Sequence, residues 1–582
     1  MINIVKLIIA LLISSFIYAQ QTPTNKALHK KIDRYLTEGV ANGFSGAVLI
    51  SRNGEIVLNK GYGLANRAEK RHNTPKTVFS TGSVTKQFTG TAILKLVEQN
   101  KLKLTDVIST FFDGLPEDKK DITIHQLLTH SAGLVDVIGD GDFDYIPTDE
   151  FFKTLFATKL LYQPGARHRY SNAGYSILAR IIELVSGQDY ESFLQQYLFE
   201  PAGMKQTGYL MPEWDNTTLA NGYARSIIDL GTMVSRFQKA GKVSWVLKGN
   251  GGIQSTQEDM FKWYKALKSN TVLSEHSTKL LTTPYIQEQQ GSDESFYAYG
   301  WAIFNSERNT KIVTHNGSNG IFFHEFMWLP EEDVVIIFST NAYSREVEIT
   351  WRLKKMLFDN SYQPKPIKKN SYFLVMDFVK KNKADQADAL LSLIKQEYGN
   401  DFKNANVLNQ VGYMLLENDP NSDWTLELFK LNVQLFPNNA NLWDSLGDGY
   451  KNKNDKENAI TSYKKALELD PTISASKKSL AELGITVKDT PQKEVVLSPE
   501  LLKSYTGTYQ LDSGHLIKIV EDKGKLYAEF AGRPGMLLTP RSEVKFAIGS
   551  RNAALLFNKN KDAKIESLTI LESGEQMVAK RK

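Results

Sequence analysis

The chain of 582 residues contains no cysteine. Disulfides, thiolate metal sites, cysteine nucleophiles and a lipid-modified N-terminal cysteine are therefore excluded. The sequence also lacks a strong net charge, because its 70 lysines and arginines nearly balance 65 aspartates and glutamates that are well mixed along the chain. Since no basic stripe stands out, the composition does not favour a nucleic-acid partner.

Long apolar runs are also scarce. The clearest one covers residues 7–18, follows Lys6 and ends just before Ala19 and a polar stretch. Because it is shorter than the ~20 residues that cross a bilayer, it predicts a secretory signal peptide over residues 1–19, with an uncleaved membrane anchor as the alternative. No later segment is long and apolar enough to span a membrane. We therefore expect an exported protein, periplasmic or secreted, with no transmembrane segment after cleavage.

The length and the changes of pattern along the chain predict a multidomain protein. Residues 28–360 begin and end with strand-like segments around a helical middle, which indicates an α/β domain with an antiparallel sheet and a helical subdomain. The polar segment 361–370 carries two prolines and is typical of a linker. Residues 371–488 show helical periodicity. Residues 499–582 contain short strands separated by Gly, Asn, Asp and Lys, which favour a small all-β barrel or sandwich.

One window of the helical region has the spacing of the tetratricopeptide repeat. The matching positions are Trp443, Leu446, Gly447, Tyr450, Ala459, Tyr463, Ala466 and Pro471. The preceding window is degenerate and keeps Gly412, Phe429 and Pro437 in roughly corresponding places. Two interpretations fit this segment, a groove that binds a protein partner through a peptide and a plain helical spacer.

The stretch FSTGSVTKQFTG places Lys86 three residues after Ser83, at the start of an apolar-periodic helix. The two side chains then share one face of the helix. A buried amine with a lowered pKa could deprotonate the Ser83 hydroxyl and make it a nucleophile. The same spacing occurs four more times, starting at Ser392, Ser462, Ser474 and Ser542. Taken alone, the pair is therefore explained as well by a helix that begins with a serine cap.

Two further motifs carry candidate groups. In RYSNAGY, Tyr170 and Asn172 stand at the entry of another apolar helix, where a phenol could relay protons and an amide could bind a lysine or a substrate. The plainer interpretation is that Ser171 or Asn172 caps that helix. In KIVTHNGSNG, His315 closes a strand and could shuttle protons, and Gly317 leaves room for a substrate along the backbone. Its plainer interpretation is a surface histidine at a strand end.

The three motifs occur in the order found in the serine β-lactamase-like and penicillin-binding-protein family, class C type. The flanking segments ITIHQLLTHSAGL, EPAGM, GGIQST and YGWAI are similar to that family as well. The sequence resembles the family over about residues 28–360. The C-terminal β segment, in turn, resembles the lipocalin-like domain that often follows certain exported serine hydrolases.

The resemblance implies an exported serine hydrolase that needs no metal or organic cofactor. By similarity, Ser83 is acylated, Lys86 helps to deprotonate it, and Tyr170 serves as base and proton relay. Asn172 is implied to position the substrate. The backbone N–H groups of Ser83 and Ser318 are implied to form the oxyanion hole.

The third motif departs from the family pattern. β-Lactamases and penicillin-binding proteins carry Lys-Thr-Gly or a close variant there, whereas this sequence has His315, Asn316 and Gly317, a version familiar from the esterase and peptidase branches. Without a permanent cation, recognition of a substrate carboxylate weakens near neutral pH. Esters, or peptides and amides including those of D-amino acids, therefore fit better than β-lactams. The alternative is a catalytically idle scaffold whose repeats bind an envelope partner.

Two other patterns are set aside. His125 and His130 are five residues apart and lack the glutamate of a zinc-protease helix, so both are interpreted as helix-packing residues. The stretch GYGLAN, residues 61–66, has only two glycines and is interpreted as the continuation of a strand rather than a dinucleotide loop.

Overall fold

The computed structural model describes 24–138, 145–344, 347–399, 402, 404–487, 495, 497–511, 516–530, 535–548, 553–572 and 575–582. The predicted signal peptide lies outside the described residues. The chain divides into two compact units, Met1–Phe373 and Leu374–Lys582. Among the helices within the described ranges, none combines the length and the apolar character that a bilayer crossing requires.

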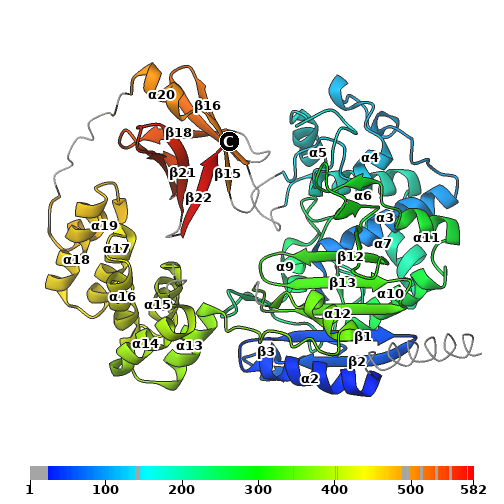
Figure 1. The fold of residues 1–582 in the computed structure, drawn as a ribbon, viewed down its shortest axis with the longest axis horizontal. Helices are drawn as coiled ribbons and strands as arrows, with labels where there is room; N and C mark the ends of the chain where they lie inside the picture. The colour runs from blue at the N-terminus through cyan, green and yellow to red at the C-terminus, as the bar shows by residue number, and fades with distance from the viewer. Residues whose placement is uncertain are drawn as a thin grey trace, which may run out of the picture. The chain divides into compact units, whose positions relative to one another are not determined.

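An eight-stranded antiparallel sheet forms the centre of the first unit (Figure 1). In spatial order its strands are β2 (Glu55–Tyr62), β1 (Gly46–Arg52), β14 (Val334–Thr340), β13 (Phe323–Leu329), β12 (Lys311–Ser318), β11 (Ala302–Asn305), β10 (Ser295–Tyr297) and β9 (Ile286–Gln287). The pairing of β1 with β14 joins strands almost 300 residues apart, beginning with Gly46 opposite Thr340. The prediction of one α/β domain closed by sequence-distant strands is therefore confirmed.

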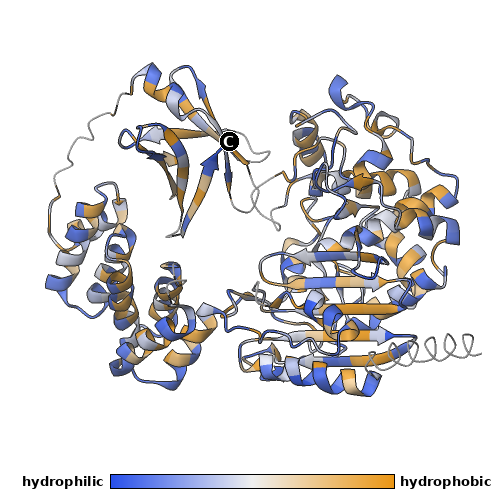
Figure 2. Cartoon of the chain, viewed as in Figure 1, coloured by the Kyte–Doolittle hydropathy of each residue, from blue (hydrophilic) through white to orange (hydrophobic). Residues whose placement is uncertain are grey.

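The middle of this sheet is covered on both faces, because every residue of β13 and β14 is buried. Side chains alternate between two apolar clusters, as a pleated strand requires. On β14, Val335 and Ile337 belong to one cluster, whereas the residues on either side of them belong to the other. Helices α2 (Asn25–Val40) and α12 (Thr350–Phe358) cover the second cluster, and α10 (Gln257–Lys268) packs in the first. Figure 2 shows the strands of the sheet coloured largely as hydrophobic.

The helical subdomain lies on the α10 side of the sheet and forms the larger cluster with it. Its main helices are α3 (Thr85–Glu98), α4 (Ile124–Leu128), α5 (Thr148–Ala157), α6 (Asn172–Ser186), α7 (Tyr190–Leu194), α8 (Glu200–Ala202), α9 (Met233–Ala240) and α11 (Glu275–Leu281). Short strand pairs link them, namely β3 (Leu64–Asn66) with β4 (Arg71–His72), β5 (Phe79–Ser80) with β8 (Gln254–Ser255), and β6 (Tyr223–Ala224) with β7 (Ile228–Asp229). Eleven of the fourteen residues of α3 are buried, so this helix runs through the core of the subdomain.

The last helix of this unit is shorter than the sequence pattern predicts. The apolar spacing suggests a helix over 343–358, but α12 begins only at Thr350. The N–H of Tyr343 donates to the backbone oxygen of Ile321, and the described residues between 343 and 349 are not α-helical. The Asn-Gly pair at residues 53–54 predicts a turn between two strands, and both residues lie at positive φ between β1 and β2.

Helix pairs dominate the start of the second unit. They follow α13 (Ser371–Lys381), and comprise α14 (Ala387–Tyr398), α15 (Asn406–Asn418), α16 (Asp423–Leu435), α17 (Ala440–Asn452), α18 (Lys456–Leu469) and α19 (Ser474–Glu482). A Cβ on Gly447 would come within 2.5 Å of the Tyr463 ring, and a Cβ on Gly412 would come equally close to the Phe429 ring. The predicted degenerate window therefore packs its helices through the same glycine-against-ring contact as the clear repeat.

A closed eight-stranded barrel ends the chain, preceded by α20 (Pro499–Tyr505). Its strands are β15 (Gly507–Leu511), β16 (Leu516–Asp522), β17 (Lys525–Phe530), β18 (Met536–Pro540), β19 (Lys545–Ile548), β20 (Ala553–Lys559), β21 (Ile565–Glu572) and β22 (Glu575–Arg581). The sequence pattern identifies five of these strands and misses β18, β19 and β22. The first two are short, and β22 carries more polar than apolar residues. Buried aromatic rings, among them Tyr505, Phe546 and Phe557, pack together inside the barrel.

Candidate active site

Ser83 and Lys86 meet at the start of α3. Ser83 lies in a 3-10 turn, Gly82–Val84, that leads directly into the helix. The side chain of Lys86 is fully buried, and its Nζ lies 3.3 Å from Ser83 Oγ. Two shorter bonds hold the same nitrogen, 2.7 Å to Asn172 Oδ1 and 2.6 Å to the backbone oxygen of Asn250.

These contacts orient the lysine nitrogen. Burial lowers the pKa of Lys86 well below its usual value, although the charge of Asp136 opposes that shift, so the neutral amine is favoured. A neutral amine has two hydrogens and one lone pair. The oxygens of Asn172 and Asn250 can only accept hydrogen bonds, so they take both hydrogens and leave the lone pair for the Ser83 hydroxyl.

Ser83 does not act as a helix cap. The cap positions of its turn and of α3 are Thr81 and Val84, and neither makes a side-chain capping bond. Other copies of the spacing behave differently, since Ser392 Oγ donates to the backbone oxygen of Asp388 and Ser462 Oγ to that of Asn458. In those two copies the hydroxyl is bonded to its own helix and not to the lysine.

Tyr170 lies beside this pair. Lys86 Nζ is 4.6 Å from the centroid of its ring. Burial raises the pKa of Tyr170 far above its usual value, while a hydrogen bond with Ser83 opposes the shift and the charges of Asp136 and Glu288 add to it. The phenol therefore keeps its proton in the free protein, which suits a proton relay better than an initial base.

The second motif divides its two tasks between neighbouring residues. Ser171 is the N-cap of α6, and its Oγ accepts from Gly174 N–H. The side chain of Asn172 takes no part in capping, because its Oδ1 accepts from Lys86 and its Nδ2 donates to Asp136 Oδ1 at 3.0 Å. Ser171 therefore caps the helix, whereas Asn172 contacts the lysine.

His315 is brought near the site by β12, but its ring is engaged within the protein. Nδ1 lies 2.6 Å from the backbone oxygen of Asn316, which can only accept, so Nδ1 carries the proton. Nε2 then accepts from the hydroxyl of Tyr297 at 3.0 Å. Burial, with Lys86 adding, lowers the pKa of His315 to about 3. The ring is a buried neutral group, and the interpretation as a surface histidine is wrong.

The first and third motifs touch through their backbones. A Cβ on Gly317 would lie 2.2 Å from the oxygen of Thr81 and 2.4 Å from the nitrogen of Ser83. A Cβ on Gly82, which has φ +51, would lie 2.9 Å from the nitrogen of Ser318. Only glycines permit this approach. As a result, the segment that carries the N–H of Ser83 lies beside the segment that carries the N–H of Ser318.

His130 lies just outside α4, but it is buried and its ring packs against Tyr175 of α6, with 4.9 Å between the ring centroids. Helix α4 ends at Leu128. His130 follows it at φ +55, and its Nδ1 accepts from the N–H of Ser171 at 3.1 Å. Its ring centroid lies 4.2 Å from that of Tyr170. His125 does lie on α4, where its Nδ1 is 2.7 Å from the Tyr299 hydroxyl.

Sequence motifs alone missed four other groups at the site. Asp136, Tyr297 and the backbone oxygen of Asn250 bond directly to motif residues, and His130 packs against one. A backbone oxygen leaves no signature in a sequence. The tyrosine and the aspartate stand outside recognisable motifs, and only the segment LLTHSAGL marked the neighbourhood of His130.

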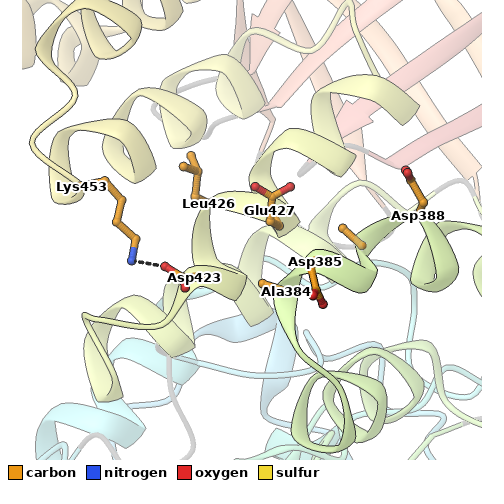
Figure 3. A pocket seen from close by; sticks show the side chains of 8 residues that line it. Ala384, Asp385, Asp388, Asp423, Leu426, Glu427 and Lys453 are labelled. Atoms are coloured by element: carbon orange, nitrogen blue, oxygen red, sulfur yellow. Dashed lines mark hydrogen bonds and ion pairs between the residues drawn. The ribbon is translucent and has the colours of Figure 1, made fainter.

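A separate cavity of about 470 Å³ lies among the helices of the second unit (Figure 3). Its lining is acidic, with Asp385, Asp388, Asp423 and Glu427, and Lys453 pairs with Asp423 at 2.8 Å. None of the lining residues belongs to the three motifs. This cavity is therefore distinct from the Ser83 site.

The antiparallel sheet, its helical subdomain and the serine beside a buried lysine form a β-lactamase-like domain. The model of the β-lactamase family matches residues 32–355, and the chain belongs to that family. The model of the tetratricopeptide repeat matches residues 440–473, over the α17–α18 pair.

Known relatives are similar to part of this chain. A putative penicillin-binding protein, PbpX, of Bacillus subtilis is 36% identical over 261 residues, which are 44% of this chain and 62% of that protein. A teichoic acid D-alanine hydrolase of Staphylococcus aureus is 27% identical over 343 residues, 58% of this chain and 79% of that protein. The crystal structure of a penicillin-binding protein from Bacillus halodurans covers 55% of this chain and 99% of its own, with a TM-score of 0.48 and 26% identity. The chain thus spans less than two thirds of the length of PbpX.

Proposed function

We propose that the protein is an exported serine hydrolase that forms an acyl-enzyme on Ser83. The observation that carries the proposal is the buried nitrogen of Lys86, whose two bonds to acceptor oxygens direct its lone pair to the Ser83 hydroxyl. An amine in this position is able to act as a general base without becoming permanently charged.

The chemistry follows from these positions. Ser83 Oγ attacks the substrate carbonyl while its proton passes to Lys86, and the N–H groups of Ser83 and Ser318 stabilise the oxyanion. The bond to the leaving group then breaks, and that group takes a proton relayed through Tyr170 from Lys86. Water repeats the sequence on the acyl-enzyme, which releases the acid and restores the Ser83 hydroxyl. Asn172 holds Lys86 throughout and keeps one N–H for the substrate.

We propose esters, and amides including those of D-amino acids, as substrates in preference to β-lactams. The nitrogens of His315 are both engaged within the protein, so the third motif offers no cation to a substrate carboxylate. The similarity to a teichoic acid D-alanine hydrolase supports a D-alanyl ester as the first compound to examine. The repeat segment is proposed to bind a protein partner.

Labelling with a fluorophosphonate probe and with a fluorescent penicillin tests the nucleophile, with the modified residue mapped by mass spectrometry. We expect modification of Ser83, and none in Ser83→Ala. The matched control is Ser462→Ala, which removes the serine of another Ser-x-x-Lys copy and should label like the wild type. Folded wild type that reacts with neither reagent contradicts the proposal and favours the idle-scaffold alternative.

Turnover of a substrate panel tests the specificity. We expect p-nitrophenyl acetate and D-alanyl esters to be hydrolysed faster than nitrocefin. Loss of the nucleophile in a serine hydrolase lowers kcat by about 10⁶-fold, so Ser83→Ala should show no activity above background. Faster hydrolysis of nitrocefin than of the esters would refute the specificity but not the nucleophile.

A further inference from the structure

Val135 and Asp136 contact the first turn of α6 through four hydrogen bonds. Val135 O accepts from Ser171 Oγ at 2.7 Å, and Asp136 O accepts from the N–H of Ala173 at 2.8 Å. The carboxylate of Asp136 takes the other two, from the backbone N–H of Asn172 at 3.1 Å and from its side-chain Nδ2 at 3.0 Å. No sequence motif and no step of the reaction above assigns a role to this carboxylate.

The contact decides which way the amide of Asn172 points. An ionised carboxylate can only accept hydrogen bonds, so the NH2 end of the amide must face Asp136. The amide oxygen therefore faces Lys86, where it accepts at 2.7 Å. With the amide turned over, its NH2 would compete with Ser83 for the lone pair of the amine.

We propose that Asp136 is a positioning residue that fixes the polarity of the chain Asp136–Asn172–Lys86–Ser83, and so leaves the lysine lone pair to the serine hydroxyl. The inference rests on the proposed function, because its consequence is the reactivity of Ser83. It adds a residue that touches neither the nucleophile nor its base.

The kinetic test compares Asp136→Ala, Asp136→Asn and the matched control Asp149→Asn, which removes an exposed carboxylate at the start of α5. Misplacing a catalytic group by about 1 Å can cost about 100-fold in rate. We expect Asp136→Ala to lower the fluorophosphonate labelling rate and kcat for p-nitrophenyl acetate by about 10- to 100-fold, with KM within about twofold. Asp136→Asn keeps an accepting oxygen, so it should recover most of the rate. The control should match the wild type.

A double-mutant cycle separates positioning from a loss of folding. If Asp136 acts through Asn172, the change Asp136→Ala should cost less than about twofold in an Asn172→Ala background. Effects that multiply in the two backgrounds, or an Asp136→Asn variant as slow as Asp136→Ala, would overturn the proposal. Thermal unfolding of each variant monitors the fold.

A comparison of crystal structures keeps this inference separate from the proposed function. In the wild type we expect Lys86 Nζ within hydrogen-bonding distance of Ser83 Oγ, and in Asp136→Ala we expect the Asn172 amide or Lys86 to be displaced. If Ser83 is never labelled, the proposed function fails, yet this comparison still decides the role of Asp136. An undisturbed Asn172–Lys86 contact in Asp136→Ala refutes it.

Discussion

The buried carboxyl of Glu325 makes the stability of the first unit depend on pH. This residue lies in β13, is 3% exposed and stands between Phe323 and Met327, which pack beneath α2 and α12. Burial raises the pKa of Glu325 to about 7, nearby Glu348 adds to the shift, and polar side chains of α12 oppose it. Below about pH 7 the folded state therefore prefers the protonated carboxyl.

The sign and size of the effect follow from that shift. A group whose pKa is higher in the folded state contributes stability below its unfolded value and loses it as pH rises through the folded value. For Glu325 the window runs from its ordinary value of 4.5 to about 7. A difference of one pH unit in pKa corresponds to about 1.4 kcal/mol, so full ionisation costs about 3 kcal/mol.

The test compares Glu325→Gln with the wild type, because glutamine keeps the shape and cannot ionise. We expect similar stability at pH 4.5 and a variant that is more stable by about 3 kcal/mol at pH 8. Urea unfolding is followed by tryptophan fluorescence. Six of the tryptophans lie in the first unit, namely Trp214, Trp245, Trp263, Trp301, Trp328 and Trp351.

The test uses the difference in free energy of unfolding between Glu325→Gln and the wild type at each pH, because other buried groups also make stability depend on pH. Burial lowers the pKa values of His324 and His315 to about 3. These two histidines therefore make the folded state less stable as pH falls, which is the opposite of the effect of Glu325. The exposed Glu294→Gln serves as the matched control and should follow the wild type. A stability difference between Glu325→Gln and the wild type that is the same at pH 4.5 and pH 8 would refute the reasoning.

Three further predictions concern the site. Gly317→Ala should abolish labelling of Ser83 while the protein still folds, because the new Cβ would lie within 2.4 Å of backbone atoms; wild-type labelling would contradict this contact. Lys86→Met should lose labelling at every pH. In the wild type the labelling rate should rise with pH through the lowered pKa of Lys86 and reach its plateau below pH 10.5, the ordinary pKa of a lysine. A plateau reached only above pH 10.5 argues against a buried neutral amine. His315→Gln should leave the pH profile between 5 and 8 unchanged, since the ring does not titrate there; a shifted profile would assign the ring a proton-transfer role.

The sequence predicts the fold well where side chains alternate or repeat. The alternation of β13 and β14 between two apolar clusters is periodic, and so is the glycine-against-ring contact of Gly447 with Tyr463. Elements set by backbone pairing are harder to predict. The strands β18 and β19 are only five and four residues long, and their pairing with each other and with β17 and β20 defines them.

The candidate site likewise contains residues that the sequence predicts and groups that it does not. Ser83, Lys86 and Tyr170 are chemically distinctive and stand in motifs, so the sequence shows them. The groups that surround these three residues are harder to predict, because tertiary contacts bring them together and hydrogen-bond direction decides what each one does. The backbone oxygen of Asn250 has no sequence signature, and nothing in the sequence indicates that Tyr297 and the backbone oxygen of Asn316 occupy both ring nitrogens of His315.

Hydrogen-bond direction therefore links the chemistry to the fold. The amine of Lys86 serves as a base only if its lone pair, and not a hydrogen, faces Ser83. That condition is met by two oxygens from separate segments, one on the side chain of Asn172 and one on the backbone of Asn250. Arginine has donors in this position and no lone pair to offer. Lys86→Arg should consequently be as inactive as Lys86→Met, even though it keeps a basic side chain, and a labelled Arg variant would show that a positive charge beside Ser83 is sufficient.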